Sequence, residues 1–200
     1  MIAAFFTGLK LALGLILVIG PQNAFVLRQG LRREHVLAVV LFCAASDAIL
    51  IAAGVAGLSP LTALVPLAQD ILRWGGAAFL LVYGLRSFRA AFRGGEVLRA
   101  AEGRGAALGP ALATVAALTW LNPHVWLDTV VLIGSVAAQF PGDRLAFGAG
   151  AASGSFLFFF TLGFGARLLA PLFARPRAWQ VLDVAVGVII WSVAYTLIRG

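Results

Sequence analysis

The sequence predicts an all-α integral membrane protein, built as a single transmembrane domain over residues 1–200. Hydrophobic residues make up 62% of the 200 residues and charged residues only 12%, whereas a water-soluble domain is about a quarter charged. Apolar segments of about 20 residues, the length that crosses a bilayer as a helix, follow one another with short connections between them. This leaves no room for a soluble catalytic module, so we do not expect an enzyme.

Six segments have the length and composition of a membrane helix. The third is the least apolar, because Asp70 and Arg73 lie in its first turns and only residues 74–85 are free of charge. Twelve residues at 1.5 Å each cross about 18 Å of a hydrocarbon core about 30 Å thick, so we expect this charged pair at the membrane interface. The six predicted spans are 3–27, 36–57, 65–86, 107–138, 145–167 and 178–198.

The positive charges concentrate in the first, third and fifth connections. The formal net charge is +7, and most of the arginines fall in the loops 28–35, 86–105 and 171–178. Because cytoplasmic loops carry the excess of Lys and Arg, we expect these three loops in the cytoplasm and both termini outside. Basic loops also attract anionic membrane lipid, which we favour over nucleic acid as their partner. A five-span chain with a re-entrant first or third segment is the alternative.

Proline interrupts the first and the fourth apolar segments. It removes a backbone donor and clashes with the preceding turn, and the carbonyl groups freed inside a membrane must be met by protein or by water in a cavity. Amide side chains stand beside each proline and can serve as partners. Two interrupted segments, one in each half, indicate a binding site at the midplane of a transporter. The residues of the breaks are Gly20, Pro21, Gln22 and Asn23 in the first segment, and Asn122 and Pro123 in the fourth.

The paired breaks also indicate a diverged repeat with halves at about 1–104 and 105–200. Residues 72–85 and 182–195 share a small residue near the start, a bulky apolar run and a small residue near the end. With three spans in each half, the second half is inverted in the membrane relative to the first, an arrangement found in many transporters. We therefore expect two inverted three-helix repeats with broken first and fourth helices.

Two aspartates lie within predicted spans, where a charge is costly. Asp47 is at the centre of the second segment, and a carboxylate at that depth costs about 2.5–3.5 kcal/mol on insertion scales. Asp128 lies just past the second break, and His124 is its i, i+4 neighbour on a restarted helix. Two acids and a titratable histidine can bind a cation and exchange it for a proton. The alternatives are an Asp47 neutralised by Arg28 or Arg167, and a histidine that only caps or packs.

Two tryptophans, Trp120 and Trp126, flank the second break. A tryptophan face near a dry carboxylate suits a guanidinium or ammonium group, and this cation–π attraction is worth about 2 kcal/mol when desolvated. The alternative is that the two rings fill space around the kink.

Other chemistries find little support in the sequence. Zinc needs three or four ligands, and His35, the one histidine besides His124, lies in a predicted loop. The lone Cys43 cannot form an internal disulfide or a CxxC pair. Ser153 and Ser155 stand without an evident base or oxyanion pattern. We therefore expect no metal site, no cofactor and no intramembrane hydrolase.

Three blocks of sequence carry a more specific signal. They are Gly20–Val26 with Gln29 and Gly30, Ser46–Ile51 with Ala53 and Gly54, and Thr119–Thr129. Together they resemble the lysine exporter (LysE) family of bacterial amino-acid exporters, and most closely its arginine-exporting branch. The resemblance runs in order over nearly the whole chain, including the phenylalanine-rich fifth segment. Position 126 departs from the branch, because it holds tryptophan where tyrosine is expected.

The resemblance implies a secondary exporter of L-arginine, with L-lysine as a further candidate substrate, across the inner membrane and driven by the proton motive force. It also implies that Asp47 and Asp128 are the functional acids, with Asn23 and Asn122 at the breaks. Moving a cation out against an inside-negative potential costs about 2.3 kcal/mol per charge per 100 mV. Inward exchange of one proton cancels the charge that is moved.

Two other functions stay open from the residues alone. One is export of neutral amino acids or homoserine by a protein of related build, although paired intramembrane acids favour a cationic substrate. The other is a membrane scaffold in which the aspartates pair with arginines. The sequence leaves the oligomeric state open, a homo-oligomer included.

Overall fold

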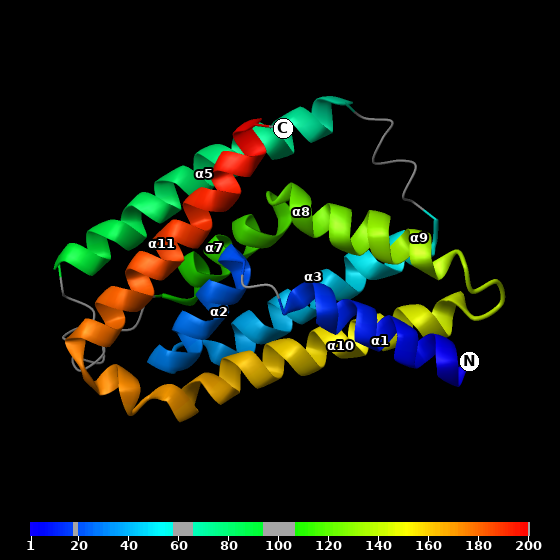
Figure 1. The fold of residues 1–200 in the computed structure, drawn as a ribbon, viewed down its shortest axis with the longest axis horizontal. Helices are drawn as coiled ribbons and strands as arrows, with labels where there is room; N and C mark the ends of the chain where they lie inside the picture. The colour runs from blue at the N-terminus through cyan, green and yellow to red at the C-terminus, as the bar shows by residue number, and fades with distance from the viewer. Residues whose placement is uncertain (18–19, 58–65, 94–106, 200) are drawn as a thin grey trace.

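The computed structural model describes residues 1–17, 20–57, 66–93 and 107–199, and all regular structure in these ranges is helical (Figure 1). The prediction of an all-α protein is therefore confirmed for this part of the chain. The helices are α1 (Ile2–Ile16), α2 (Pro21–Arg32), α3 (Val36–Val55), α5 (Pro66–Arg93), α7 (Leu108–Trp120), α8 (Pro123–Trp126), the π-helical η1 (Leu127–Leu132), α9 (Ile133–Ala137), α10 (Arg144–Gly165), the 3₁₀ helices η2 (Ala166–Leu169) and η3 (Leu172–Ala174), and α11 (Pro176–Arg199).

Three described helices are long and apolar enough to cross a membrane by themselves: α3, the continuous helix Arg144–Leu169, and α11. A fourth candidate span is the pair α1 and α2, whose axes meet at 83°. The remaining apolar helices, α7 and the run Pro123–Ala137, are shorter. Helix length and composition thus give three or four candidate spans, fewer than the six expected. The proline breaks divide the first and fourth predicted spans into shorter helices, and α5, which covers the third, is continuous but carries five charged residues.

Both breaks lie where proline predicts them. Pro21 and Pro123 each occupy the first position of a helix, where a missing N–H has no consequence and the fixed φ suits the helix. In front of them Gly20 is extended at φ −103° and ψ 179°, and Asn122 caps α8 with its side-chain oxygen. The chain therefore restarts as a helix directly after each break.

Two predicted loop boundaries are wrong. Residues 28–32 belong to α2 and residues 86–93 belong to α5, whereas the sequence analysis placed both stretches in loops. The loop prediction ended each span at its first arginine. In the structure a helix continues past that point, because Arg86 and Arg89 extend into solvent and Arg28 finds an ion-pair partner inside the protein. The rest of the predicted loop 86–105 lies outside the described residues.

The long helices pack in pairs. In Figure 1, α1 runs alongside α10 and α5 runs alongside α11, and α3 packs against α10 on one side and against α7, η1 and α9 on the other. One apolar core, which includes Phe159, joins α2, α3, α5, α7, α10 and α11. A second, which includes Phe147, joins α1, α3, α9 and α10. Along α3 these two cores are separated by the turn that carries Asp47.

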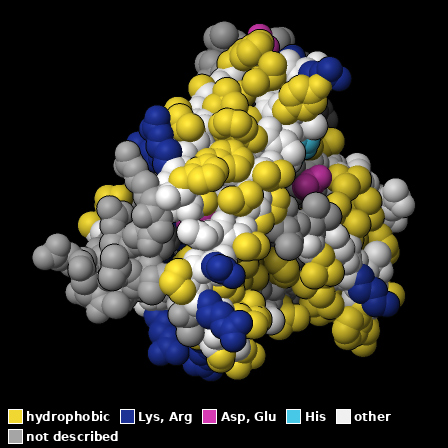
Figure 2. All heavy atoms as spheres, turned by 60° about the vertical axis from the view of Figure 1, so that its left-hand side comes forward, with side chains coloured by type: hydrophobic (Ala, Val, Ile, Leu, Met, Phe, Trp, Pro, Cys, Tyr) yellow, Lys and Arg dark blue, Asp and Glu magenta, His cyan; other side chains and the backbone are white. Residues whose placement is uncertain are grey.

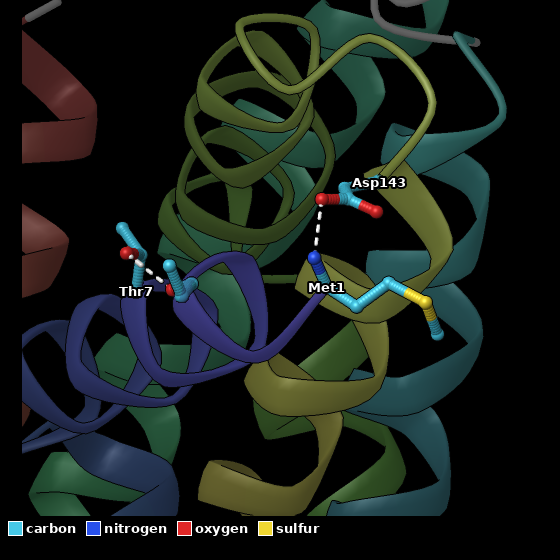
Figure 3. A network of polar contacts seen from close by, with 4 residues as sticks. Met1, Thr7 and Asp143 are labelled. Carbon is cyan, nitrogen blue, oxygen red and sulfur yellow. Dashed lines mark hydrogen bonds and ion pairs between the residues drawn. The ribbon is translucent and has the colours of Figure 1, made fainter.

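Glycines allow α1 and α10 to approach each other closely. A Cβ on Gly150 would meet the carbonyl group of Phe5, and a Cβ on Gly8 would meet the carbonyl group of Phe147. At the start of these helices the Met1 amino group pairs with Asp143 at 2.5 Å, and the Thr7 hydroxyl donates to the Ala3 carbonyl at 2.8 Å (Figure 3). The first half of the broken span is thus fixed against α10.

The outer surface is strongly apolar. Large hydrophobic side chains such as Leu41, Ile49, Leu157 and Val188 are exposed on α3, α10 and α11. Figure 2 shows one face on which hydrophobic side chains spread widely; one group of Lys and Arg side chains lies towards its lower edge, and others stand apart at the sides and near the top. A broad apolar outer surface is what a protein surrounded by lipid presents.

Candidate functional site

A cavity of about 450 Å³ lies where the two breaks meet. Its wall is formed by the end of α1, the start of α2, the middle of α3 and the segment from α8 to α9, with Phe159 and Val193 from α10 and α11. Binding sites for small molecules commonly have volumes of roughly 300–1,000 Å³. The predicted site residues that line it are Gly20, Pro21, Gln22, Asn23, Asp47, Asn122, His124 and Asp128.

The amide side chains at the breaks meet the backbone groups that the breaks leave open. Asn23 donates from Nδ2 to the Ile16 carbonyl at 2.7 Å, one of the groups left at the end of α1. Asn122 accepts from the backbone N–H of His124 at 3.2 Å. Gln22 is only 7% exposed, and its side-chain amide interacts with the thiol of Cys43, a weak acceptor, while its Nε2 makes no regular hydrogen bond within the described part of the chain. This buried donor at the cavity wall can therefore turn to a stronger acceptor on a ligand.

Asp47 is 3% exposed and comes from α3. Its Oδ2 accepts a hydrogen bond from the hydroxyl of Ser155 on α10. Among the described residues no ion pair reaches Asp47. Neither arginine considered as a structural partner of Asp47 pairs with it: Arg28 pairs with Asp183, and Arg167 is exposed on η2. A buried carboxylate whose partner is a neutral hydroxyl has its charge uncompensated, so it can still attract a cation.

Asp128 reaches the same cavity from the opposite break. It is half-buried on η1, and His124, one helical stretch earlier on α8, is exposed and also lines the cavity. The i, i+4 spacing predicts both residues on one face of an α-helix, but the backbone changes to π-helical geometry from Leu127 onward. Single π-helical turns are frequent at functional sites. Two carboxylates from different helices thus face one cavity.

Pro123 and Trp126 are not among the residues that line this cavity. The Trp126 ring packs edge-on against the Trp120 ring, with 5.7 Å between the ring centroids, and its Nε1 donates to the Trp120 carbonyl at 3.0 Å. Trp120 in turn donates from Nε1 to the Ser46 hydroxyl on α3 at 3.2 Å. These contacts fit the alternative in which the two rings fill and brace the second break, and a cation–π role for Trp126 stays a prediction.

One buried acid was missed by the sequence analysis. Asp183 of α11 is 1% exposed, and its Oδ1 lies 3.2 Å from a guanidinium nitrogen of Arg28, whose side chain is 11% exposed. Asp183 lies within a predicted span, so the argument applied to Asp47 would have found it. Asp183 thus forms the ion pair with Arg28 that was the structural alternative for Asp47. The two buried acids therefore differ: Asp183 meets a cation, and Asp47 meets a neutral hydroxyl.

Ser155 was considered only as a hydrolase nucleophile, and its contact with Asp47 was not expected. The two residues are 108 positions apart, and nothing local in either segment marks them as partners. Only the packing of α3 on α10 brings them together. The described residues hold no group of three or more His, Cys, Asp or Glu side chains that could bind a metal ion.

The sequence matches the family described as LysE type translocator over residues 13–200. It is 44% identical to the arginine exporter protein ArgO of Pectobacterium carotovorum subsp. carotovorum, across the whole chain and 98% of that protein. It is 42% identical to the ArgO proteins of Salmonella schwarzengrund and Salmonella enteritidis, across the whole chain and 95% of each. No solved structure matches the chain.

The ion pair between Arg28 and Asp183 leads to a stability prediction. Asp183→Ala should lower the free energy of unfolding by about 3–5 kcal/mol, because it leaves the Arg28 charge buried and unpaired. The double variant Arg28→Met/Asp183→Leu should recover most of this loss, since hydrophobic residues can replace a buried pair at little cost. Thermal unfolding of the purified protein in detergent measures both, with Arg89→Gln, an exposed arginine, as the control. A loss below about 0.5 kcal/mol for Asp183→Ala would contradict the assignment.

Proposed function

This chain belongs to the LysE-type translocator family, and we propose that it is a secondary exporter of basic amino acids with L-arginine as its main substrate and L-lysine as a second one. Export runs from the cytoplasm across the inner membrane and is coupled to the proton motive force. The observation that carries the proposal is the cavity at the two breaks, where Asp47 and Asp128 face the same space. The described residues lining it include no Lys or Arg. Relatives of 42–44% identity that bear the name arginine exporter support the choice of substrate.

The cavity offers complementary groups to both ends of a basic amino acid. The two carboxylates attract the side-chain cation, since charged hydrogen bonds of this kind are roughly twice as strong as neutral ones. The Nε2 of Gln22 and the first turn of α2 are the groups proposed to meet the substrate carboxylate, because a helix N-terminus carries partial positive charge. His124 stands beside Asp128 and is a second candidate for carrying a proton.

Proton coupling follows from the charge that must be moved. A basic amino acid leaves against a membrane potential that costs about 2.3 kcal/mol per charge per 100 mV. A proton that enters and occupies Asp47 or Asp128 on the outer side displaces the cation and balances its charge. Acids within membrane segments commonly serve such proton pathways.

For the architecture we propose one domain of six spans, with inverted repeats over about 1–104 and 105–200. The packing supports this: α10 packs on α1 of the first broken span, as α3 packs on α7, η1 and α9 of the second. The third helix of each half, α5 and α11, pack on each other. A short identity, Ala44–Ala45–Ser46 and Ala151–Ala152–Ser153, falls at matching places of α3 and α10.

The arginine-rich segments 28–35, 86–105 and 171–178, which include the ends of α2 and α5 and the start of α11, are proposed to face the cytoplasm, with both termini outside. In Figure 1 the end of α2, the end of α5 and the start of α11 gather at the left. The N-terminus and the turn before α10 lie together at the right, joined by the ion pair of Met1 and Asp143. The arginine-rich end is then the side that meets anionic lipid.

The scaffold alternative predicts that the intramembrane aspartates pair with arginines. Asp183 does so, but Asp47 accepts from Ser155 instead. The structure thus supplies a structural role for one buried acid and leaves Asp47 facing the cavity.

The transport proposal is tested by counterflow of labelled arginine, lysine, threonine and leucine in proteoliposomes, with and without a pH gradient. Arginine should accumulate most, lysine less, and the pH gradient should accelerate both. Asp47→Asn and Asp128→Asn should each lower arginine counterflow at least tenfold while inserting normally, because each removes a carboxylate from the cavity. Asp70→Asn, on an exposed position of α5, is the matched control and should transport at the wild-type rate.

Other results would each decide against part of this proposal. A preference for leucine or threonine would favour the neutral-substrate exporter. No counterflow of any of the four would argue against transport. Variants that insert normally and keep wild-type rates would remove the aspartates from the mechanism, and variants that lose stability without any dependence on substrate would favour the scaffold.

The orientation is tested by adding one cysteine at a time at exposed positions and treating intact cells with a membrane-impermeant maleimide. Ala3→Cys and Gln139→Cys should be labelled and Arg175→Cys should not, since only the first two are proposed to lie outside. The parent protein, with its buried Cys43, is the control for background labelling. Protection of Ala3→Cys together with labelling of Gln139→Cys would instead support the five-span chain with a re-entrant first segment.

A further inference from the structure

Asp47 and Ser155 form a fully buried polar contact within an apolar helix interface. Ser155 is 0% exposed, and its hydroxyl donates to Oδ2 of Asp47 across the α3–α10 interface. Asp47 lines the cavity, whereas Ser155 does not. The serine therefore stands behind the carboxylate, on the side away from the proposed substrate.

Ser155 differs from several other hydroxyl residues in the helices of this protein. A serine or threonine inside a helix usually donates to the carbonyl four residues earlier. Ser153 does so to Ala149 at 2.7 Å, and Thr119 does so to Val115 at 2.8 Å. Ser155 could donate to Ala151 in the same way, but its hydroxyl is directed to the carboxylate. A single hydroxyl hydrogen can serve only one acceptor at a time, so the contact with Asp47 is made in preference to the local one.

We propose that Ser155 is the positioning residue of the substrate site: it holds Oδ2 of Asp47 so that Oδ1 is presented to the side-chain cation of the substrate. This rests on the proposed function. The contact fixes the carboxylate in one orientation, and it supplies the buried charge with a donor while the cavity is empty. When a basic amino acid enters, its cation meets Oδ1 and the Ser155 hydrogen bond is kept.

A protonated Asp47 no longer needs this donor. The hydroxyl of Ser155 can then turn to the Ala151 carbonyl, as Ser153 does to Ala149. Hydrogen bonds to charged acceptors are stronger than those to neutral ones. Ser155 therefore stabilises the charged form of Asp47, which binds substrate, more than the protonated form, which has released substrate. Its removal should weaken substrate binding more than it slows the transport step.

The test is counterflow of labelled arginine over a range of concentrations in proteoliposomes holding equal amounts of inserted protein. Ser155→Ala should raise the KM for arginine about tenfold, the low end of the effect expected for loss of a hydrogen bond to a charged group, while Vmax changes less than about twofold. Ser155→Thr keeps the hydroxyl and should stay close to the wild-type KM. Ser153→Ala removes a hydroxyl two residues away on the same helix and should match the wild type.

A merely structural serine would give a different pattern. Loss of inserted protein or of Vmax with an unchanged KM in Ser155→Ala, or failure of Ser155→Thr to restore the KM, would overturn the proposal. If Ser155→Ala does not insert, Ser155→Cys keeps a side chain of similar shape with a weaker donor. It should then show a KM raised about threefold, and a wild-type KM in this variant would equally refute the proposal. Absence of arginine counterflow in the wild type would instead refute the proposed function.

Discussion

Backbone groups that lose their helical partners inside a membrane must find others, and most of this structure follows from how that requirement is met at Pro21 and Pro123. The Asn23 side chain takes a carbonyl at the end of α1, and the Asn122 side chain takes an N–H at the start of α8. Each break leaves polar groups and a helix N-terminus at the same depth in the protein. The cavity lies at this depth, and its polar lining allows the carboxylates of Asp47 and Asp128 to be placed inside the protein.

The helix α2 connects this site to the rest of the molecule. Its first turn carries Gln22 and Asn23 at the cavity, and Arg28, two turns later, pairs with Asp183 of α11. A buried pair adds little net stability over hydrophobic residues, but a shifted register would leave two charges unpaired. The pair therefore fixes the position of α2 against α11. Among the described residues Asp47 has a neutral partner, the hydroxyl of Ser155, and so keeps its charge for a ligand.

Much of this could be predicted from the sequence, because its strongest signals are local. Composition gave the membrane class, prolines marked both breaks, and a carboxylate inside an apolar run marked Asp47 and Asp128. The helix ends were less predictable: Arg28 and Arg86 were taken as loop residues, yet a helix can continue past a charge that finds a partner or reaches solvent. The contact between Ser155 and Asp47 had no local signal, since it depends on how α10 packs against α3.

The central claim is that the cavity between the two breaks is the place where a basic amino acid binds. The most direct test places a cysteine in its wall, Val125→Cys on α8, and follows the rate of its reaction with a water-soluble thiol reagent in the purified protein. The parent protein, whose Cys43 is buried, provides the background rate. The account predicts that L-arginine slows the reaction in a saturable way while L-leucine at equal concentration does not. A reaction rate at Val125→Cys that is the same with and without L-arginine would contradict it.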